Sequence, residues 1–558
     1  TRFVVPDDKK FCKDIYIEQR KDKNAKNGQK VVARITSYPE GDKKPEGEIL
    51  EVLGFPWEKN VDIMSVASQY GLKESFPMEC IKEVSALPDS VSAKDLIGRK
   101  DFTGIKCFTI DGEDARDFDD AVSVRANNDG TFSLGVHIAD VSHYVTENSA
   151  TDKEAYERGT SVYFPELVIP MLPTKLSNGL CSLNEKQKRL TLSVTMKINK
   201  KGDVVDYEID KGVISSCHRL TYTEVFAMMT GDKVVRDKYS DIISDIDTMD
   251  ALAKVLENKR NKRGNIDFQK SEVKFVMDEK GDVVDILPYE RNSAHKLIEE
   301  FMIIANETVA QYVYNLSLPF VYRVHEKPDS EKMDILMELL KGLGIAVKEK
   351  ADKIHSSTLQ SALREAENTP YFDLVNKVML RTMQKAKYSP INIGHFGLSS
   401  ECYCHFTSPI RRYPDLIVHR ILSAVLFGKM EEQACKHFDI VCSEGSVQSS
   451  IRERVADEAE RTVDDLKKCQ YAVKYIGESF TGLVSGVAEF GIFVELSNTV
   501  EGLVRVENLV GDNYSFNEKK FTLSNGAKTY SLGDKIDVTI SSVNVSARKI
   551  DFSLKNLD

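Results

Sequence analysis

Six acidic side chains lie within fourteen residues of the sequence, in the stretch "TIDGEDARDFDDAV" at positions 109–122. Four of them have a spacing that suits joint chemistry: Asp111, Asp117, Asp119 and Asp120. Two carboxylates about 4 Å apart repel by about 4 kcal/mol at an effective dielectric of 20, so a folded chain needs a cation or a proton between them. Carboxylate oxygens suit Mg²⁺, which commonly completes its shell with water and substrate phosphate. Since two such ions can promote hydrolysis of a phosphodiester, the cluster predicts metal-assisted hydrolysis, with a solvated acidic loop as the alternative.

The backbone around these aspartates must bend if all four are to meet. Asp117 and Asp119 are two apart and would share one face of a strand, which directs Asp120 to the other face. A bend after Asp119 would bring Asp120 back, and Gly112 favours irregular backbone upstream. "DFDDAV" also matches a loose aspartyl-phosphatase pattern, in which the nucleophilic aspartate follows a buried strand. The polar "DGEDAR" before Asp117 argues against that alternative.

The rest of the chain supplies the elements that position these residues. Its 558 residues are enough for two to four domains. The formal net charge of −11 argues against a broad basic coat for nucleic acid but is compatible with a basic internal channel. The ten cysteines form no repeated framework, and no apolar run reaches the roughly 18 residues of a membrane span. We therefore expect a protein of the reducing cytoplasm with free thiols and no membrane contact.

Hydrophobic patterning divides the chain into three parts. Residues 1–88 contain short alternating pieces such as "KVVARITSY" and predict a small β-barrel. Residues 89–475 predict a larger mixed α+β domain, which begins with a polar linker at "PDSVSAKDLIGRKDFTG". Residues 476–558 return to β pieces with glycine turns and predict a second barrel of the oligonucleotide-binding (OB) type. The predicted fold is therefore multidomain, with small OB-type β-barrels flanking a larger α+β catalytic domain.

The sequence makes specific predictions for two helices and one pair of aromatic residues. The helix predicted over residues 293–315 is apolar on most faces, which indicates burial. An amphipathic helix is predicted over about 446–476, and Gly477 supplies its end. In the last barrel, Phe490 and Phe493 fit either the core or a base-stacking face.

Four stretches in a fixed order resemble one known family. The acidic stretch is followed by "SVYFPELVIPMLPTKLSNGLCSLN", "AHKLIEEFMIIAN" and "HFTSPIRRYPDLIVHR", and together they span residues 109–420. They closely resemble the ribonuclease II/ribonuclease R family, and their residues are more similar to those of the ribonuclease R branch. By this resemblance the first barrel is similar to a cold-shock domain, and the last is similar to a ribosomal S-one-type RNA-binding domain. The resemblance covers nearly the whole chain.

The resemblance implies a catalytic role for several residues. The four aspartates would hold catalytic Mg²⁺, and Asp119 would matter most for cleavage. Arg411 and Glu460 would be catalytic as well, and a planar, permanently charged guanidinium suits contact with phosphate. Without the resemblance, an arginine that precedes Asp415 is also a candidate for a structural ion pair, and Arg412 fits either role.

The resemblance also implies RNA contacts for five residues: Tyr163, Phe268, Tyr222, Glu299 and Arg412. Tyr163 and Phe268 would stack on bases near the 3′ end, which accepts every sequence, whereas as isolated aromatics they would belong to the core. Tyr222 and Glu299 would select ribose through its 2′-hydroxyl. Glu299 lies in an otherwise apolar helix, where an unpaired carboxylate is costly.

Two further groups of side chains have alternative readings. Cys402, Cys404 and His405 in "ECYCHF" suggest zinc, but no second cluster in the sequence completes four ligands. His143 has no partner visible from the sequence, and we expect it to be structural.

We therefore predict a Mg²⁺-dependent, processive 3′-to-5′ exoribonuclease that releases nucleoside 5′-monophosphates; polarity, processivity and products come from the resemblance. The expected partners are single-stranded RNA 3′ ends and structured RNA with a 3′ overhang, and the expected state is a cytoplasmic monomer. Since the sequence begins at Thr1 and ends at "KNLD", we expect it to lack the family's helix-turn-helix, first cold-shock domain and lysine-rich tail. The rival is a catalytically silent RNA-binding regulator, which loss of a cluster aspartate would favour; all four are present.

Overall fold

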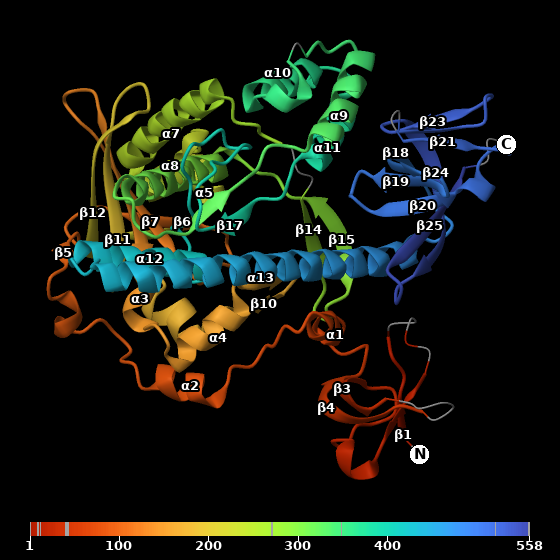
Figure 1. Cartoon of the computed structure of the whole chain (residues 1–558), viewed down its shortest axis with the longest axis horizontal. Coiled ribbons are helices and arrows are strands. Elements are labelled where there is room, and N and C mark those ends of the chain that lie inside the picture. The colour runs from red at the N-terminus through yellow and green to blue at the C-terminus, as the bar shows by residue number, and fades with distance from the viewer. Residues whose placement is uncertain are drawn as a thin grey trace.

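The computed structural model describes residues 2–7, 11, 13–38, 44–268, 272–347, 349–518 and 521–555. Figure 1 shows a small N-terminal β domain, a large central domain and a C-terminal barrel, with the long helix α13 (Glu432–Ala472) crossing the molecule to the barrel. The predicted fold class, small β domains flanking a mixed α+β domain, is confirmed. A membrane-spanning segment is absent from the described helices, none of which combines the required length with a sufficiently apolar sequence.

The N-terminal sheet pairs its strands in the order β1-β2-β4-β3. Their bounds are Arg2–Val4 (β1), Ile15–Ile17 (β2), Lys30–Ser37 (β3) and Glu46–Gly54 (β4). Strand β3 falls within "KVVARITSY", which the sequence predicted as β structure. The buried core of this sheet is small and consists of Ile15, Ile17 and Ile49.

Two helices follow β4, where the sequence predicted more β structure. They are α1 (Val61–Gln69) and α2 (Met78–Ser85). Helical spacing places the apolar residues of α1 on one face, which packs against α13, and its buried members are Val61, Ile63, Val66 and Ala67. Lys467 of α13 is almost fully buried, and its ammonium lies 2.7 Å from the Asp62 carboxylate of α1. Helix α1 is therefore the element that docks the N-terminal domain on α13.

The polar stretch over 88–104 is part of the central domain, so the predicted linker is wrong. Ser92 and Asp95 form a capping box for a short 3₁₀ helix over Ala93–Leu96. The guanidinium of Arg99 then donates to the buried carboxylate of Asp140 at 2.7 Å. Polar residues here satisfy buried partners that lie far away in the sequence, which local composition does not reveal.

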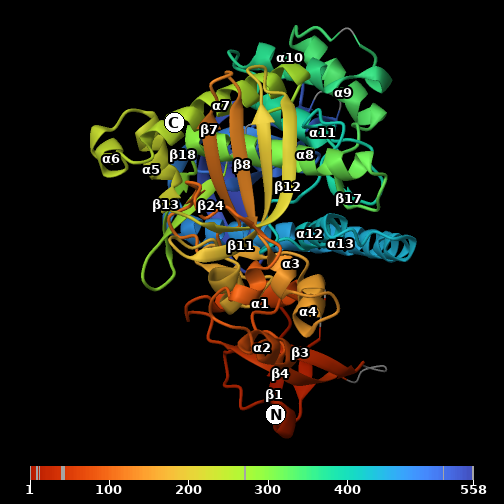
Figure 2. The same ribbon diagram turned by 90° about the vertical axis from the view of Figure 1, so that its left-hand side faces the viewer.

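Seven strands form the central sheet, in the order β13-β6-β7-β8-β11-β12-β5. Their bounds are Lys100–Asp101 (β5), Phe108–Asp111 (β6), Asp120–Ala126 (β7), Phe132–Ala139 (β8), Lys188–Ile198 (β11), Val204–Ser215 (β12) and His218–Thr221 (β13). Both alternating faces of β8 and β11 are buried, so the sheet is covered on both sides there. Figure 2 shows these strands in front of the helices α7 (Ile243–Arg263) and α8 (Ser293–Asn315). Helix α8 has the predicted bounds and is buried along most of its length.

Shorter helices and hairpins complete the central domain. The helices are α3 (Val141–Tyr144), α4 (Ala150–Arg158), α5 (Tyr222–Met229), α6 (Lys233–Lys238), α9 (Ser330–Gly342), α10 (Ser356–Ala366), α11 (Phe372–Thr382) and α12 (Tyr413–Leu426). The hairpins are β9 (Val162–Phe164) with β10 (Leu167–Ile169), and β14 (Val273–Met277) with β15 (Val283–Pro288). A further antiparallel pair joins β16 (Tyr322–Val324) to β17 (Lys387–Ser389) across α9, α10 and α11. Helices α9, α10 and α11 share an apolar core of their own.

Helix α13 begins at Glu432, well before the predicted start at Ser446. Gly445 lies inside the helix because α12 passes close to it: a Cβ on Gly445 would lie 2.4 Å from Ile417 Cδ1. The glycine therefore permits helix contact and does not mark a helix end. The predicted C-terminal stop is confirmed, since the backbone turns at Gly477 with φ +92°.

The C-terminal barrel is closed in the order β18-β19-β20-β25-β24. Its strands are Ser479–Ala488 (β18), Gly491–Leu496 (β19), Glu501–Arg505 (β20), Lys535–Asn544 (β24) and Lys549–Leu554 (β25), and a smaller sheet holds Ser515–Asn517 (β21), Thr522–Ser524 (β22) and Thr529–Ser531 (β23). The barrel core includes Cys469 of α13 and Ile286 of β15, so it is continuous with the central domain. Phe490 is exposed, whereas Phe493 is partly buried.

Candidate active site

Strands β6 and β7 bring the aspartates to one end of the central sheet. They pair antiparallel at Phe108 and Val122 and separate beyond that point. Asp111 ends β6 and Asp120 begins β7, so the two diverging chains hold Asp111 near the 117–120 segment. Residues 116–119 are irregular, so Asp117 and Asp119 do not lie on one face of a strand as the sequence predicted. The irregular backbone gathers the carboxylates instead.

The irregular segment is fixed by Ser182, a fully buried residue. The Ser182 hydroxyl donates to the Arg116 carbonyl at 2.8 Å and accepts from the Phe118 amide at 3.0 Å. The Leu183 amide donates to the Phe118 carbonyl at 3.0 Å, and the Ala139 amide of β8 donates to the carbonyl of Asp119 at 2.9 Å. The backbone of this segment is therefore anchored at Arg116, Phe118 and Asp119.

Asp119 is the most deeply buried aspartate of the cluster, with 4% of its surface exposed. Its Oδ1 accepts from the Ile410 amide at 2.8 Å. Its Oδ2 accepts no hydrogen bond from any described residue, although Arg411 Nε is 3.6 Å away. The Oδ2 of Asp111 is likewise buried and accepts no hydrogen bond within the described part of the chain. Buried polar atoms are normally paired, so these two oxygens mark the cluster as a place for a further ligand.

The electrostatics of the cluster support this view. Burial raises the pKa of Asp119 well above its ordinary value, although Arg411 opposes the rise. Burial also raises the pKa of Asp111, and the other three aspartates add to that rise. Burial raises the pKa of Asp120 to about 6, against the charges of Arg411 and Arg412. Because the protein compensates these charges incompletely, a bound cation would favour the ionised carboxylates.

The donor set fits a divalent cation, but it does not form a finished cage. Among the described His, Cys, Asp and Glu side chains, no three converge closely enough to hold a metal ion. The described carboxylates therefore do not form a preformed cage, and the metal site of four aspartates stays a prediction. Mg²⁺ is usually held by one or two carboxylates, with water and substrate phosphate completing its shell. The unpaired oxygens of Asp111 and Asp119 meet that requirement.

The β9–β10 hairpin presents Tyr163 to the cluster. Its hydroxyl donates to Asp117 Oδ2 at 3.2 Å, and its amide donates to Glu460 Oε1 of α13 at 2.8 Å. The Tyr163 side chain remains 41% exposed, so its ring is accessible to a ligand. Burial raises the pKa of Glu460 to about 7. Both predicted residues thus lie at the cluster, and the contact of Glu460 with the Tyr163 backbone suits a positioning role.

Two adjacent arginines take different positions. Arg412 donates to Asp415 at 2.7 Å and is largely buried, so it forms the structural ion pair that the sequence left open. Its predicted contact with RNA has no support in this geometry. The Arg411 side chain is 43% exposed beside Asp119. Its loop is anchored by the Ser161 amide, which donates to the Arg411 carbonyl at 2.9 Å.

Tyr222 lies at the start of α5, close to the cluster. Its ring stacks on His295 of α8, with centroids 4.0 Å apart. Burial raises the pKa of Tyr222, and the nearby charges of Asp120 and Asp111 add to the rise. Glu299 lies one helical turn after His295, on the same face of α8. Tyr222 and Glu299 thus lie along the same face of α8.

The environment of Glu299 differs from the prediction. It is partly exposed and pairs with Arg291, so it is not an unpaired carboxylate in apolar surroundings. The buried carboxylate of this helix is Glu300, which accepts from Arg260 Nε at 2.9 Å. The apolar pattern identified the right turn of the helix but the wrong one of two adjacent glutamates.

Three other predicted features lie apart from the aspartates. Phe268 is partly buried against the core of α9, α10 and α11, and no described contact joins it to the cluster. In "ECYCHF", Nδ1 of His405 shares a hydrogen bond with the Tyr388 hydroxyl at 2.8 Å, and no described metal site includes this stretch. His143 is structural in position, with Nε2 2.9 Å from Asp95 Oδ1.

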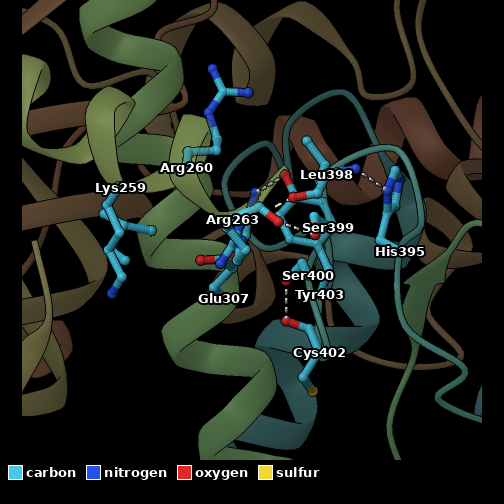
Figure 3. Close-up of polar contacts among 12 residues, drawn as sticks. Lys259, Arg260, Arg263, Glu307, His395, Leu398, Ser399, Ser400, Cys402 and Tyr403 are labelled. Atoms are coloured by element: carbon cyan, nitrogen blue, oxygen red, sulfur yellow. Dashed lines mark hydrogen bonds and ion pairs between the residues drawn. The ribbon is translucent and has the colours of Figure 1, made fainter. Parts of the chain in front are cut away.

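A cleft of about 950 Å³ lies elsewhere, between α7, α8 and the 392–402 loop. Figure 3 shows the polar contacts along its wall, where Ser399 donates to the Arg263 carbonyl at 2.8 Å. Its charges compensate each other: Arg263 pairs with Glu307 at 2.6 Å, and Lys259 pairs with Asp203 at 2.9 Å. Despite its size, this cleft has no counterpart of the uncompensated carboxylates, so we place the chemistry at Asp119.

Two residues of the site were missed by the sequence reasoning, Ser182 and His295. Both lie inside stretches that carried the family resemblance, "LSNGLCSLN" and "AHKLIEEFMIIAN". The available signal was a polar side chain within or beside an apolar run, which needs a buried partner. The partner itself, such as Arg116 for Ser182, lies 66 residues away and only the fold reveals it.

Three family models match successive parts of the chain. The family model of the RNB domain matches residues 99–428, that of the cold shock domain matches 3–77, and that of the S1 RNA binding domain matches 474–555. Ribonuclease R of Thermotoga maritima is 44% identical over 564 residues, which cover 100% of this chain and 79% of that protein.

Two solved structures are similar over nearly the whole chain. Mycoplasma genitalium RNase R in complex with ribose methylated single-stranded RNA has a TM-score of 0.93 and 28% identity, covering 99% of this chain and 86% of that one. The same protein in complex with double-stranded RNA has a TM-score of 0.88 and 27% identity, covering 99% and 93%. The RNB match alone covers more than half of the sequence, in the region that holds the four aspartates. The chain therefore belongs to the ribonuclease R family.

Proposed function

We propose that this chain degrades RNA from the 3′ end, hydrolysing phosphodiesters processively to nucleoside 5′-monophosphates with Mg²⁺ at the aspartate cluster. The observation that carries the proposal is Asp119, whose buried Oδ2 accepts no hydrogen bond from a described residue and lies 3.6 Å from Arg411 Nε. A buried, uncompensated carboxylate beside an accessible guanidinium suits the joint binding of a cation and a phosphate. Membership of the ribonuclease R family supports RNA as the substrate and the 3′-to-5′ direction.

Different residues of the site contact the metal ion, the phosphate and the base at the RNA end. Asp111 and Asp119 would hold Mg²⁺, whose chemistry is to acidify a bound water and to stabilise charge on the phosphate oxygens. Arg411 donates from its exposed guanidinium to a phosphate oxygen. The exposed Tyr163 ring stacks on a base, and Glu460 holds the backbone of Tyr163 in place.

Selection of ribose is proposed for Tyr222 and Glu299. Tyr222 lies near Asp111 and Asp120, and both predicted residues border the same face of α8. A tyrosine hydroxyl and a carboxylate can each hydrogen-bond to a 2′-hydroxyl, which DNA lacks. Glu299→Ala should narrow the ratio of RNA to DNA cleavage rates, whereas Glu257→Ala, which removes another carboxylate of this charged network, should not. An unchanged ratio in a folded Glu299→Ala variant would remove Glu299 from this role.

A time course with end-labelled RNA tests direction, product and metal together. RNA labelled at its 3′ end should release a labelled nucleoside 5′-monophosphate at once. RNA labelled at its 5′ end should pass to a short final product without accumulating intermediates. Mg²⁺ should support the reaction, and a chelator should stop it. Internal cuts, or release that begins at the 5′ end, would contradict the proposal.

Substrates with different ends separate this proposal from a silent RNA binder. The structures of Mycoplasma genitalium RNase R with single-stranded and with double-stranded RNA support RNA binding by this chain. We propose that a monomer acts on single-stranded 3′ ends and on structured RNA with a 3′ overhang. A duplex with a 3′ overhang should be digested faster than a blunt duplex of the same sequence. A silent regulator would bind both and shorten neither.

A further inference from the structure

A pocket of about 410 Å³ lies between α4, α12 and α13, which are neighbours in Figure 1. The ring of Tyr156 on α4 meets the ring of Tyr413 on α12 edge to face, with centroids 5.4 Å apart. Ile417 and Val441 add apolar surface, and Gly445 of α13 lines the pocket without a side chain. A cavity of this size with aromatic and apolar walls suits a small organic molecule.

The charges around this pocket are mostly negative. Its lining includes four carboxylates and one cation, from Glu147, Asp152, Glu157, Glu444 and Lys153. The charge of Asp152 is balanced by Arg420 at 2.6 Å, and Glu147 lies 2.7 Å from Nε2 of His437. Glu157 and Glu444 are exposed and pair with no cation in the part of the chain that the structure describes. Two negative charges at the pocket are therefore available to a ligand.

These two carboxylates approach one aromatic ring from different helices. Glu157 belongs to α4, whereas Glu444 belongs to α13. Burial raises the pKa of the Tyr156 hydroxyl, and the charges of Glu444 and Glu157 add to the rise, so both carboxylates lie within electrostatic reach of the ring. A cation held there would meet carboxylates on two walls and an aromatic face, which attracts positive charge.

The walls favour an organic cation over a metal ion. Among the described His, Cys, Asp and Glu side chains, no three converge closely enough to hold a metal. The side chains of Ile417 and Val441 offer no ligand atom, but they can pack against an alkyl chain. Such a chain gains from apolar contact along its length while charged groups at its ends stay near water and the carboxylates.

We propose that this pocket binds a small aliphatic diammonium cation of the polyamine class. One ammonium pairs with Glu157 and the other with Glu444, and the alkyl chain lies against the rings of Tyr156 and Tyr413. Binding there is independent of the proposed function, because no residue of the aspartate cluster lines the pocket.

Calorimetric titration of the full, RNA-free chain with putrescine tests the proposal. Excess Mg²⁺ occupies other acidic sites, and an ionic strength of about 0.15 M screens general attraction to a chain with a net charge of −11. Putrescine should bind at a single site, n-butylamine with its one ammonium should bind more weakly, and the uncharged diol of equal chain length should not bind. The absence of saturable putrescine binding at millimolar concentration would overturn the proposal. Equal affinities for putrescine and n-butylamine would overturn the recognition of two ammonium groups.

Variants that change one charge locate the binding site. Glu157→Gln and Glu444→Gln should each weaken putrescine binding by about 2- to 5-fold, as expected for exposed ion pairs, and the double variant by about 4- to 25-fold. Lys153→Gln should tighten binding instead, because it removes the one cation of the lining.

The matched control is Glu458→Gln, which neutralises an exposed carboxylate of α13 outside the pocket and should bind putrescine like wild type. Melting temperatures without putrescine should be equal in all of these variants, since the substituted side chains are exposed. Equal affinities of wild type and the Glu157→Gln/Glu444→Gln double variant would overturn the assignment, as would an equal loss in Glu458→Gln.

Discussion

Two buried aspartates of the central sheet differ in how their charge is balanced. Asp140 follows β8, and its carboxylate lies 2.7 Å from Arg99 and 3.2 Å from Lys211. Burial alone would raise its pKa, but the charges of Lys211 and Arg99 outweigh burial and hold the pKa below its ordinary value. Asp119 is similarly buried, but its partners are one backbone amide and a guanidinium at 3.6 Å, and its pKa is raised.

This difference distinguishes Asp140, a carboxylate that stabilises the fold, from Asp119, a carboxylate that is available to bind a ligand. The fold supplies Asp140 with two nearly buried cations, so its charge is balanced before anything binds. It supplies Asp119 with an anchored backbone and leaves Oδ2 without a hydrogen bond among the described residues. Uncompensated burial is costly, so a protein keeps it where a ligand completes the balance. Four experiments test this contrast, beginning with the largest expected effect.

Asp119→Asn should abolish most hydrolysis while sparing the fold. The substitution keeps the size of the side chain and removes one charge from the cluster, so cleavage should fall about a thousand-fold. RNA affinity should stay near wild type, because Arg411 and Tyr163 still grip the RNA, and the melting temperature should be equal or higher. Single-turnover cleavage, RNA binding and thermal melting in one buffer measure all three. Cleavage within a few-fold of wild type would show that the unbalanced carboxylate is not catalytic.

Asp140→Asn should have the opposite outcome for stability. Removing this charge leaves Arg99 and Lys211 largely buried without their counter-ion, which should cost about 3–5 kcal/mol in the free energy of unfolding. Urea denaturation measures that cost, and Glu432→Gln on the exposed start of α13 is the matched control, with almost no change expected. Equal stabilities of Asp119→Asn and Asp140→Asn would contradict the contrast between the two aspartates.

The two kinds of carboxylate should also respond to pH with opposite sign. The folded pKa of Asp120 is raised to about 6, so its stabilising contribution is complete below about pH 4 and is lost as the pH rises to about 6. The folded pKa of Asp140 is lowered, so its contribution is present above about pH 4 and is lost as the pH falls.

Unfolding by urea at a series of pH values, without divalent cations, measures this difference. Asp120→Asn should reduce the decline in stability between about pH 4 and pH 6 by up to about 3 kcal/mol. Asp140→Asn should leave that decline in place. If the free energy of unfolding declines equally with pH over this interval in wild type and in Asp120→Asn, the charge of Asp120 is compensated by other groups.

The smallest effect is expected at Asp117, which does receive a side-chain donor. Tyr163→Phe removes the hydroxyl that donates to Asp117 at 3.2 Å but keeps the ring, so kcat/KM should fall by about 3- to 10-fold. Tyr163→Ala removes the ring as well and should change the length of the final RNA fragment. An unchanged fragment in Tyr163→Ala would show that the ring does not hold the RNA end.

Local patterns predicted much of this fold. The helix over 293–315 followed from its apolar faces, and the predicted turn at Gly477 follows α13 and its 3₁₀ extension over Val473–Tyr475. The four aspartates were found by spacing and family resemblance, and the structure gathers them at one end of the sheet. These features depend on neighbours in the sequence, which is why they were readable.

Several errors concern partners distant in the sequence. The polar stretch around Arg99 was read as a linker because Asp140 lies 41 residues further on. Glu299 was expected in an apolar environment because its cations were not visible in the helix pattern: Arg291 precedes α8, and Arg260 belongs to α7. Likewise, Gly445 lies inside α13 because of α12, and nothing near it in the sequence shows that contact. Charge balance and close helix contact are properties of the folded chain.

The docking of α1 on α13 has a consequence for synthesis of the chain. Asp62 and its partner Lys467 are 405 residues apart. At about 5–20 residues per second, the ribosome needs roughly 20–80 s between making one and the other. During that interval the apolar face of α1, with Ile63 and Val66, lacks the α13 residues that cover it in the folded chain. The N-terminal sheet therefore emerges first but reaches its final position among the last steps, and a nascent chain is most open to chaperones and proteases at α1.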